Sequence, residues 1–171
     1  MPDPRLAPYR LPSLAFATYL VLQAVSAAAL FALKLGGDAD SVRAFYLGSE
    51  ARFTSPRSLV GLLEVAVPHA VAIPLVLFAA AHVVGFARAL PRRLHARLVA
   101  LSFGSALAGI LAGFAVRFAA PGLAWAKTGA FLLLEAALLA WAVLLVAIFV
   151  PRRAVSEAPA TRSTPARESA R

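Results

Sequence analysis

The stretch SLVGLLEVAVPHAVAIPLVLFAAAHVVGFA (Ser58–Ala87) decides the fold of this 171-residue chain. It runs between Arg57 and Arg88 and holds one carboxylate, two prolines and two histidines among apolar residues. A helix needs about 20 apolar residues to cross the ~30 Å hydrocarbon core of a bilayer, and this stretch is longer. It therefore predicts a membrane-spanning helix that tilts, kinks or begins in the interfacial layer.

The composition of the whole chain agrees with a membrane protein. Hydrophobic residues make up 61% of it, whereas soluble proteins have roughly 45–50%. There is no cysteine, which excludes disulfides, thiolate zinc sites and iron–sulfur ligation by this chain. The formal charge of +9 comes from basic residues at the ends of apolar runs and in the C-terminal segment. That placement is typical of membrane topology, so we expect a lipid bilayer as partner and no nucleic acid.

Three further apolar segments complete an all-α integral membrane four-helix bundle. The first is too long for the core of a cleaved signal peptide, so we expect it to be retained as a helix. The predicted helices cover about residues 11–34, 58–88, 98–118 and 126–150, with an outer loop at 36–57.

The placement of Lys and Arg predicts the orientation of the bundle. The cluster ARALPRRLHAR (Ala87–Arg97) is the strongest signal for a cytoplasmic loop. Residues 1–10 and 151–171 then also lie in the cytoplasm. The tail 151–171 is basic and rich in Pro, Ser and Ala, so we expect it to be disordered.

Ionisable residues inside the apolar segments are the candidate functional residues, because polar groups at membrane depth are costly unless they are paired. Counted from the outer helix ends, the two carboxylates fall about 9–12 Å deep. One interpretation is that a carboxylate pairs with a cation and ties two helices together. The alternatives are a proton, metal or small-ligand site, or carboxylates that reach water. The predicted polar layer consists of Glu64, His69, Arg117, Lys127 and Glu135.

The two histidines of the second helix suggest a haem or metal site. His69 and His82 are 13 residues apart, about 20 Å along a helix, with side chains rotated by about 140°. The remaining histidine, His95, is expected in the cytoplasmic loop, so bis-histidine haem within one chain is not expected. No cofactor is predicted for the single chain. Haem b or a metal ion held by His69 and His82 across a dimer remains an alternative.

Two other patterns bear on helix shape and packing. Pro68 and Pro74 are expected to kink the second helix because each removes a backbone donor. Ser105, Gly109 and Gly113 repeat every four residues, which lets helices approach closely. Packing within the bundle is the favoured interpretation, and a homodimer through Gly109 and Gly113 is the alternative.

The outer loop contains DADSVRAFYLGSE (Asp38–Glu50), which predicts a short amphipathic helix with an Asp N-cap. We expect that helix to lie on the outer leaflet, with Tyr46 as an interfacial anchor.

The run Ala44–His82 resembles a group of uncharacterised small four-helix bacterial inner-membrane proteins. The shared elements are a Tyr-x-Gly-x-Glu loop, Leu-Leu-Glu-Val at 62–65, and later His, Pro and His positions. One departure is that Val67 replaces the first His of a His-x-His pair. The resemblance implies a multi-pass protein of the inner membrane with a functional focus on the outer loop and second helix. The matching positions are Tyr46, Gly48, Glu50, His69, Pro74 and His82.

No motif of a soluble enzyme is present in the sequence, so no catalytic residue is predicted. The sequence favours a membrane protein of accessory, sensor or assembly type, within a larger membrane complex. A haem- or metal-binding redox protein is one alternative, and a small transporter or channel subunit is another.

Overall fold

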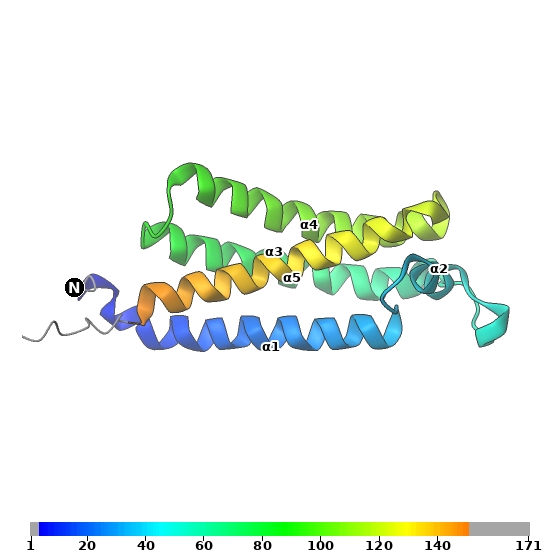
Figure 1. Cartoon of the computed structure of the whole chain (residues 1–171), viewed down its shortest axis with the longest axis horizontal. Helices are drawn as coiled ribbons and strands as arrows, with labels where there is room; N and C mark the ends of the chain where they lie inside the picture. Colours follow the sequence, from blue (N-terminus) through cyan, green and yellow to red (C-terminus); the bar gives the residue numbers. More distant parts are fainter. Residues whose placement is uncertain (1–3, 151–171) are drawn as a thin grey trace, which may run out of the picture.

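The computed structural model describes residues 4–150, which form an all-helical bundle (Figure 1). Four of its helices are long and apolar enough to cross a membrane, which confirms the predicted all-α membrane bundle. The predicted disorder of the tail 151–171 lies outside the described residues. The helices are α1 (Arg10–Lys34), α2 (Ala39–Leu47), α3 (Leu59–Phe86), α4 (Arg92–Phe118) and α5 (Ala124–Phe149), with the short 3-10 helices η1 (Pro4–Tyr9), η2 (Glu50–Arg52) and η3 (Pro121–Leu123).

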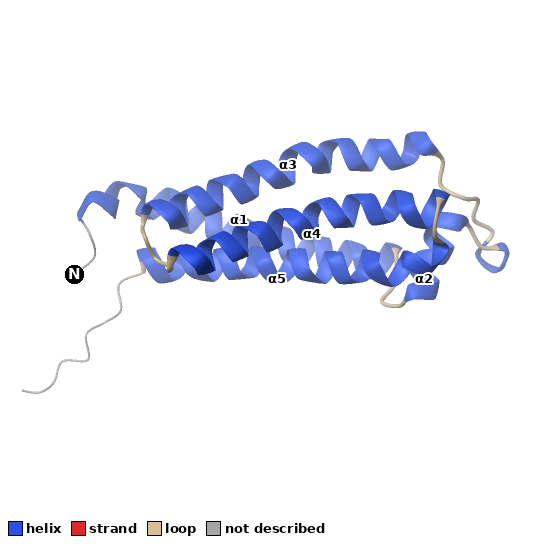
Figure 2. Cartoon of the chain, turned by 90° about the horizontal axis from the view of Figure 1, so that it is seen from above, coloured by secondary structure: helices blue, strands red, loops and turns tan. Residues whose placement is uncertain are grey.

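The two ends of the bundle differ in what covers them. Both ends of the described chain lie at one end, which we call the terminal side (Figure 1). The short helix α2 lies at the opposite end, the α2 side, and Figure 2 gives the same arrangement from above. The predicted orientation places the α2 side outside the cell.

Two helices begin earlier than the sequence predicts. α4 begins at Arg92 rather than near residue 98, because Pro91 provides the extended residue before its first turn. α5 begins at Ala124, directly after the turn Pro121–Leu123. His95 therefore lies in the first turns of α4 and not in the loop, and its ring meets Trp141 edge-on at 5.7 Å between centroids.

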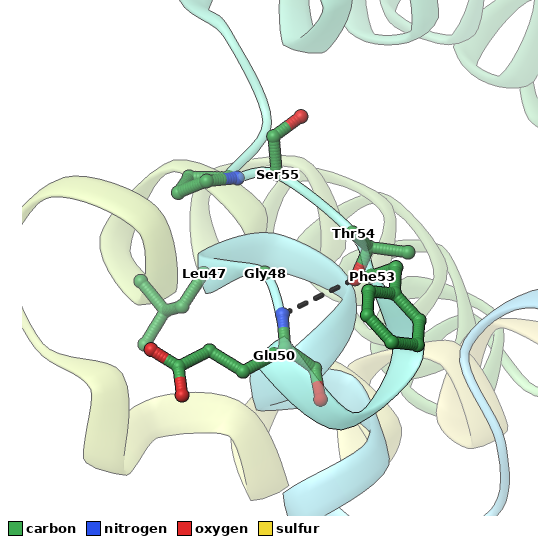
Figure 3. A pocket seen from close by; sticks show the side chains of 8 residues that line it. Leu47, Gly48, Glu50, Phe53, Thr54 and Ser55 are labelled. Carbon is green, nitrogen blue, oxygen red and sulfur yellow. Dashed lines mark hydrogen bonds between the residues drawn. The ribbon is translucent and has the colours of Figure 1, made fainter.

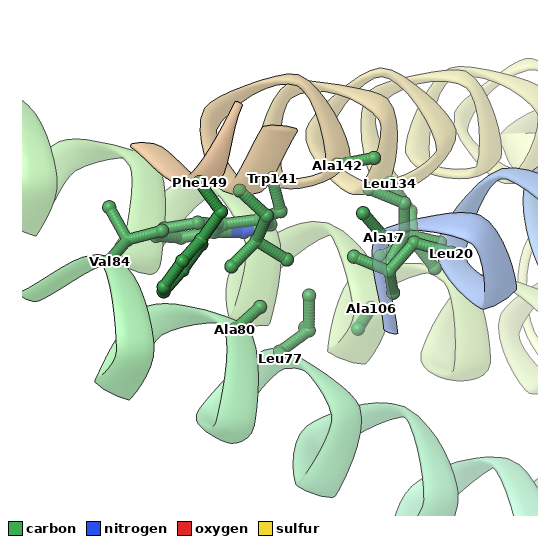
Figure 4. Packing of buried hydrophobic residues seen from close by; sticks show 12 residues of the cluster. Ala17, Leu20, Leu77, Ala80, Val84, Ala106, Leu134, Trp141, Ala142 and Phe149 are labelled. Atoms are coloured by element: carbon green, nitrogen blue, oxygen red, sulfur yellow. The ribbon is translucent and has the colours of Figure 1, made fainter. Parts of the chain in front are cut away.

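The main hydrophobic core lies in the terminal-side half, and α5 is its central element. Trp141 and Leu145 are fully buried against α1, α3 and α4 (Figure 4). The Trp141 indole Nε1 donates a hydrogen bond to the Ser102 hydroxyl at 3.0 Å, and Ser102 donates to the Leu98 carbonyl at 2.6 Å. Ser105 donates to the Ser102 carbonyl at 3.0 Å. These buried polar groups of the core are therefore hydrogen-bonded.

A smaller core lies on the α2 side, where α2 covers the end of the bundle. Asp38 caps α2 by accepting a hydrogen bond from the Ser41 backbone N–H at 2.8 Å, which also lowers the pKa of Asp38. The buried face of α2 packs onto α3, α4 and α5. The buried residues of this smaller core are Val42, Tyr46, Leu62, Val116 and Ala124.

The side chain of Tyr46 is buried in the bundle, whereas the sequence predicts that it lies at the lipid interface. The Tyr46 side chain is 6% exposed and points into the bundle, so it does not anchor the helix at the lipid interface. Tyr46 packs against α4, where its Oη would lie 3.0 Å from a Cβ added to Gly113. The apolar face of α2 is therefore satisfied by the helix ends rather than by lipid.

α3 is the peripheral helix of the bundle. Its hydropathy equals that of α4, yet only 11% of its apolar window is buried, against 33% for α4 and α5. Its buried residues face α4 and α5, and the rest of its surface is exposed. The buried residues are Leu62, Leu77, Ala80 and Val84.

Candidate functional site

Glu64 lies on the exposed surface of α3. Its neighbours on that face include Val67 and Val71, which are 59% and 66% exposed. With 100° between successive helical residues, these three side chains fall within about 60° of one another. Glu64 is about 8 Å along α3 from Leu59, at the boundary of the hydrocarbon layer. An exposed apolar face of a membrane helix thus carries a carboxylate.

His69 is also exposed, deeper along α3. Its Nδ1 lies 2.7 Å from the carbonyl oxygen of Val65. A carbonyl only accepts hydrogen bonds, so the ring donates from Nδ1, and Nε2 has no hydrogen bond within the described residues. About 15 Å separates His69 from the start of α3, which puts the ring well inside the hydrocarbon layer.

His82 stands near the other end of α3. It is exposed, and its ring stacks on Phe78 at 5.8 Å between centroids. α3 continues through Pro68 and Pro74 without interruption. Since proline has no N–H, the carbonyls of Glu64 and Ala70 lose their usual helical donors.

Lys127 of α5 points into the bundle. Its ammonium Nζ donates a hydrogen bond to the carbonyl oxygen of Gly109 on α4 at 2.7 Å. Gly109 lies about 14 Å along α4 from the helix end at Phe118. The lysine therefore binds a backbone carbonyl between two helices instead of reaching for the aqueous interface.

Glu135 lies on the side of α5 that faces α1. One turn before it, Phe131 stacks on Phe31 of α1 at 4.1 Å between centroids. The Glu135 Oε2 atom is buried and has no hydrogen-bond partner among the described residues. The hydroxyl of Thr128, about two turns earlier on the same side, is in the same condition. Sequence reasoning missed Thr128, because a threonine within an apolar segment gives no signal by itself.

Arg117 lies at the α2-side end of α4 and fixes the entry to α3. Its Nε donates to the carbonyl oxygen of Arg57 at 2.7 Å, and its guanidinium lies over the Phe118 ring at 4.9 Å. The Arg57 backbone N–H donates to the Tyr46 carbonyl at 3.0 Å. Arg57 thereby joins α2, α3 and α4, a role that its position at a helix end did not reveal.

The five residues of the predicted polar layer do not contact one another through any hydrogen bond or ion pair in residues 4–150. The only ion pair of that region joins Arg43 and Asp40. The depths also differ from expectation: because α5 begins at Ala124, Glu135 is about 16 Å from its helix start, against about 8 Å for Glu64. Within the described part of the chain, no three His, Asp or Glu side chains are grouped to hold a metal ion.

Gly109 and Gly113 lie against the chain's own residues. Tyr46 covers Gly113, and Ala130 lies 3.9 Å from the position of a Cβ on Gly109. This arrangement favours packing within the bundle for the small-residue repeat. A homodimer through these glycines stays a prediction.

The loop after α2 shows why its glycine is required. Gly48 has φ +82°, and a Cβ there would lie 2.5 Å from the Thr54 carbonyl oxygen. The segment is closed by paired backbone hydrogen bonds between Ser49 and Thr54 at 3.0 Å. Glu50 is exposed beyond this closure, and its side chain lines a shallow pocket (Figure 3). The Tyr-x-Gly-x-Glu motif therefore shapes a closed loop and leaves one carboxylate, that of Glu50, exposed.

Comparison with known protein families identifies a transmembrane helical domain in this chain. The family model Aq_1264_TM, described as a transmembrane helical domain, matches residues 36–155. The match begins after α1, so it contains α2, the loop and the three helices that follow. No curated protein and no solved structure matched the chain. Since the match spans more than half of the chain, this multi-pass membrane protein belongs to the Aq_1264_TM family of transmembrane helical domains.

Proposed function

We propose that the protein is an accessory subunit of a membrane complex in the bacterial inner membrane, and that α3 is its docking helix. The observation that carries this proposal is the exposure of Glu64 on the most peripheral helix. Ionisable side chains facing lipid are costly, and a neighbouring helix that supplies hydrogen-bonding groups removes that cost.

The partner is a membrane-spanning helix of another protein with a donor or cationic group opposite Glu64. Two copies packed in parallel through this face would bring two Glu64 carboxylates together, and like charges at an interface are unfavourable. A partner with complementary charge satisfies the same face. Val67, Val71 and Phe78 supply apolar contact area along the same face of α3.

Cysteine cross-linking tests this docking directly, because the chain contains no cysteine of its own. Single cysteines replace Val67 or Val71 on α3 in the full chain, expressed in native membranes. Leu22 and Val25 on α1, which are 56% and 62% exposed, serve as matched control positions. We expect a cross-linked species of one defined mass from the α3 positions and none from α1.

Dependence on Glu64 separates specific docking from chance capture. Glu64→Ala in the Val71→Cys background should abolish the cross-linked species, whereas Glu64→Asp should retain part of it. A species of twice the chain's own mass would contradict the proposal. So would a cross-link that survives Glu64→Ala, or equal cross-linking from α1 and α3.

A second candidate function is a haem- or metal-binding redox protein in which two copies of the chain meet at His69. Its support is the Nδ1 contact with Val65, which leaves Nε2 available in the way that ligand histidines are commonly oriented. His69 lies about 140° around α3 from Glu64, so this dimer would use a different face. Purified protein should then show a Soret band or stoichiometric metal that His69→Ala removes. Colourless, metal-free protein would rule this candidate out.

A further inference from the structure

A cleft of about 520 Å³ opens on the α2 side, between the end of α1 and the loop before α3. Its lining combines two cations, two hydroxyl residues and two aromatic rings, and contains no carboxylate. The lining residues are Lys34, Ala44, Phe45, Phe53, Thr54, Ser55 and Arg57.

Both cations of the cleft lack an acidic partner in the described region, where the only ion pair is Arg43–Asp40. The Arg57 guanidinium lies 4.3 Å from the centroid of the Phe45 ring, which holds it in a fixed direction. The backbone of Arg57 is held on both sides, by the Tyr46 carbonyl and by Arg117. The Arg57 guanidinium and the Lys34 ammonium therefore both line the cleft without an ion pair among the described residues.

The level of this cleft in the membrane follows from helix length. α1 has 25 residues, which gives about 37 Å and exceeds the ~30 Å hydrocarbon core. Lys34 is the last residue of α1, and Arg57 comes just before the start of α3 at Leu59. Both cations thus stand in the headgroup layer or the adjoining water, where phosphate groups are found.

We propose that this cleft binds a phosphate-bearing anion. Lys34 and Arg57 supply the positive charge, and the Ser55 hydroxyl supplies a hydrogen bond. Arginine suits a phosphate because its planar guanidinium can donate two parallel hydrogen bonds. The headgroup of an anionic phospholipid and a water-soluble phosphate share this chemistry. The inference concerns the α2 side and is independent of docking through α3.

Native mass spectrometry of the full-length protein in detergent tests the proposal. The probes are phosphatidylglycerol, phosphatidylcholine and inorganic phosphate. We expect one phosphatidylglycerol or phosphate to be retained in preference to phosphatidylcholine. The double variant Lys34→Gln/Arg57→Gln should weaken that binding by about tenfold or more, since it removes both charge-assisted contacts.

Matched variants keep the test independent of folding. Arg92→Gln/Arg97→Gln removes two exposed cations from the terminal side and should leave binding unchanged. Lys34→Gln alone changes an exposed residue and should weaken binding without altering the thermal unfolding temperature. Retention of phosphatidylglycerol alone identifies a lipid as the ligand, and competition by inorganic phosphate identifies a soluble one. Equal retention of phosphatidylcholine, or unchanged binding by the double variant, would overturn the proposal.

Discussion

The two halves of the bundle treat buried polar groups in opposite ways. In the terminal-side half, the Trp141 indole and the Ser102 and Ser105 hydroxyls each donate a hydrogen bond. In the α2-side half, the Lys127 ammonium donates to the backbone carbonyl of Gly109, while Thr128 and Glu135 each bury a side-chain oxygen that has no partner within residues 4–150.

The two halves therefore differ in how completely their buried polar groups are hydrogen-bonded. Buried polar groups are normally hydrogen-bonded, and the exceptions in a native structure concentrate at functional positions. The exposed ionisable residues of α3, Glu64 and His69, belong to the same α2-side half. We therefore expect changes in the terminal-side half to affect folding, and changes on the α2 side to affect function or local docking.

The largest expected effect is in the terminal-side half. Trp141→Ala should lower the free energy of unfolding by about 3–5 kcal/mol, because it leaves a cavity and removes the Ser102 partner. Thermal unfolding in detergent measures the change. Trp125→Ala is the matched control, since Trp125 is 66% exposed and should tolerate truncation. Equal destabilisation by the two variants would show that burial of Trp141 in the terminal-side core adds nothing to stability.

The second effect concerns the docking of α2. Gly113→Val should cost about 1–3 kcal/mol, because even a Cβ there lies 3.0 Å from the Tyr46 Oη. The cost should shrink in a Tyr46→Ala background, where the clashing ring is absent. Gly104→Val is the control, since nothing lies within 4 Å of a Cβ at that position. An unchanged cost in the Tyr46→Ala background would show that Tyr46 is not the contact.

A pH titration addresses the same contact. Burial raises the pKa of Tyr46 to about 12, an effect that the positive charge of Arg57 partly opposes. The docked state then keeps a proton that a free tyrosine loses, so α2 docking is fully stable below pH 10 and weakens as the pH rises toward 12. The loss is on the order of 2 kcal/mol.

Absorbance of tyrosinate at 295 nm, taken as the difference between wild type and Tyr46→Phe, should have its midpoint near pH 12. A midpoint near 10 would mean that the Tyr46 hydroxyl reaches water.

The smallest effect is at the start of α3. Ser58 accepts a hydrogen bond from the Gly61 backbone N–H at 3.1 Å, so Ser58→Ala should cost about 1 kcal/mol. Amide hydrogen exchange over residues 59–62 should accelerate. Ser26→Ala, on the exposed face of α1, serves as the control and should leave that exchange unchanged. Unaltered exchange in Ser58→Ala would mean that packing of Leu62 alone holds this helix end.

The spanning helices could be predicted because hydropathy and length decide them, as in the stretch Ser58–Ala87. Helix neighbours could not, because α3 and α4 have equal hydropathy and very different burial. Asp38 is enough to predict the N-cap of α2. The burial of the Tyr46 side chain could not be predicted, because it depends on the position of α4 next to α2.

For the candidate site, too, the sequence predicts the location of the residues but not their partners. That Glu64, His69, Lys127 and Glu135 lie within membrane-spanning helices follows from the sequence alone. The partners of these residues depend on how each helix is rotated about its axis. A helix that is apolar on all sides has no sequence pattern that predicts this rotation. Lys127 faces α4 and Glu135 faces α1, although only eight residues separate them in the sequence.

The bond from Lys127 to Gly109 has a consequence for how the chain enters the membrane. A lysine makes transfer of a lone helix from the translocon into lipid less favourable, and for Lys127, in the first turn of α5, the cost is below the ~3 kcal/mol of a central position. The carbonyl that relieves this cost belongs to the preceding helix, across the short turn Pro121–Leu123. We therefore expect α4 and α5 to enter the bilayer together as a helical hairpin joined by this hydrogen bond.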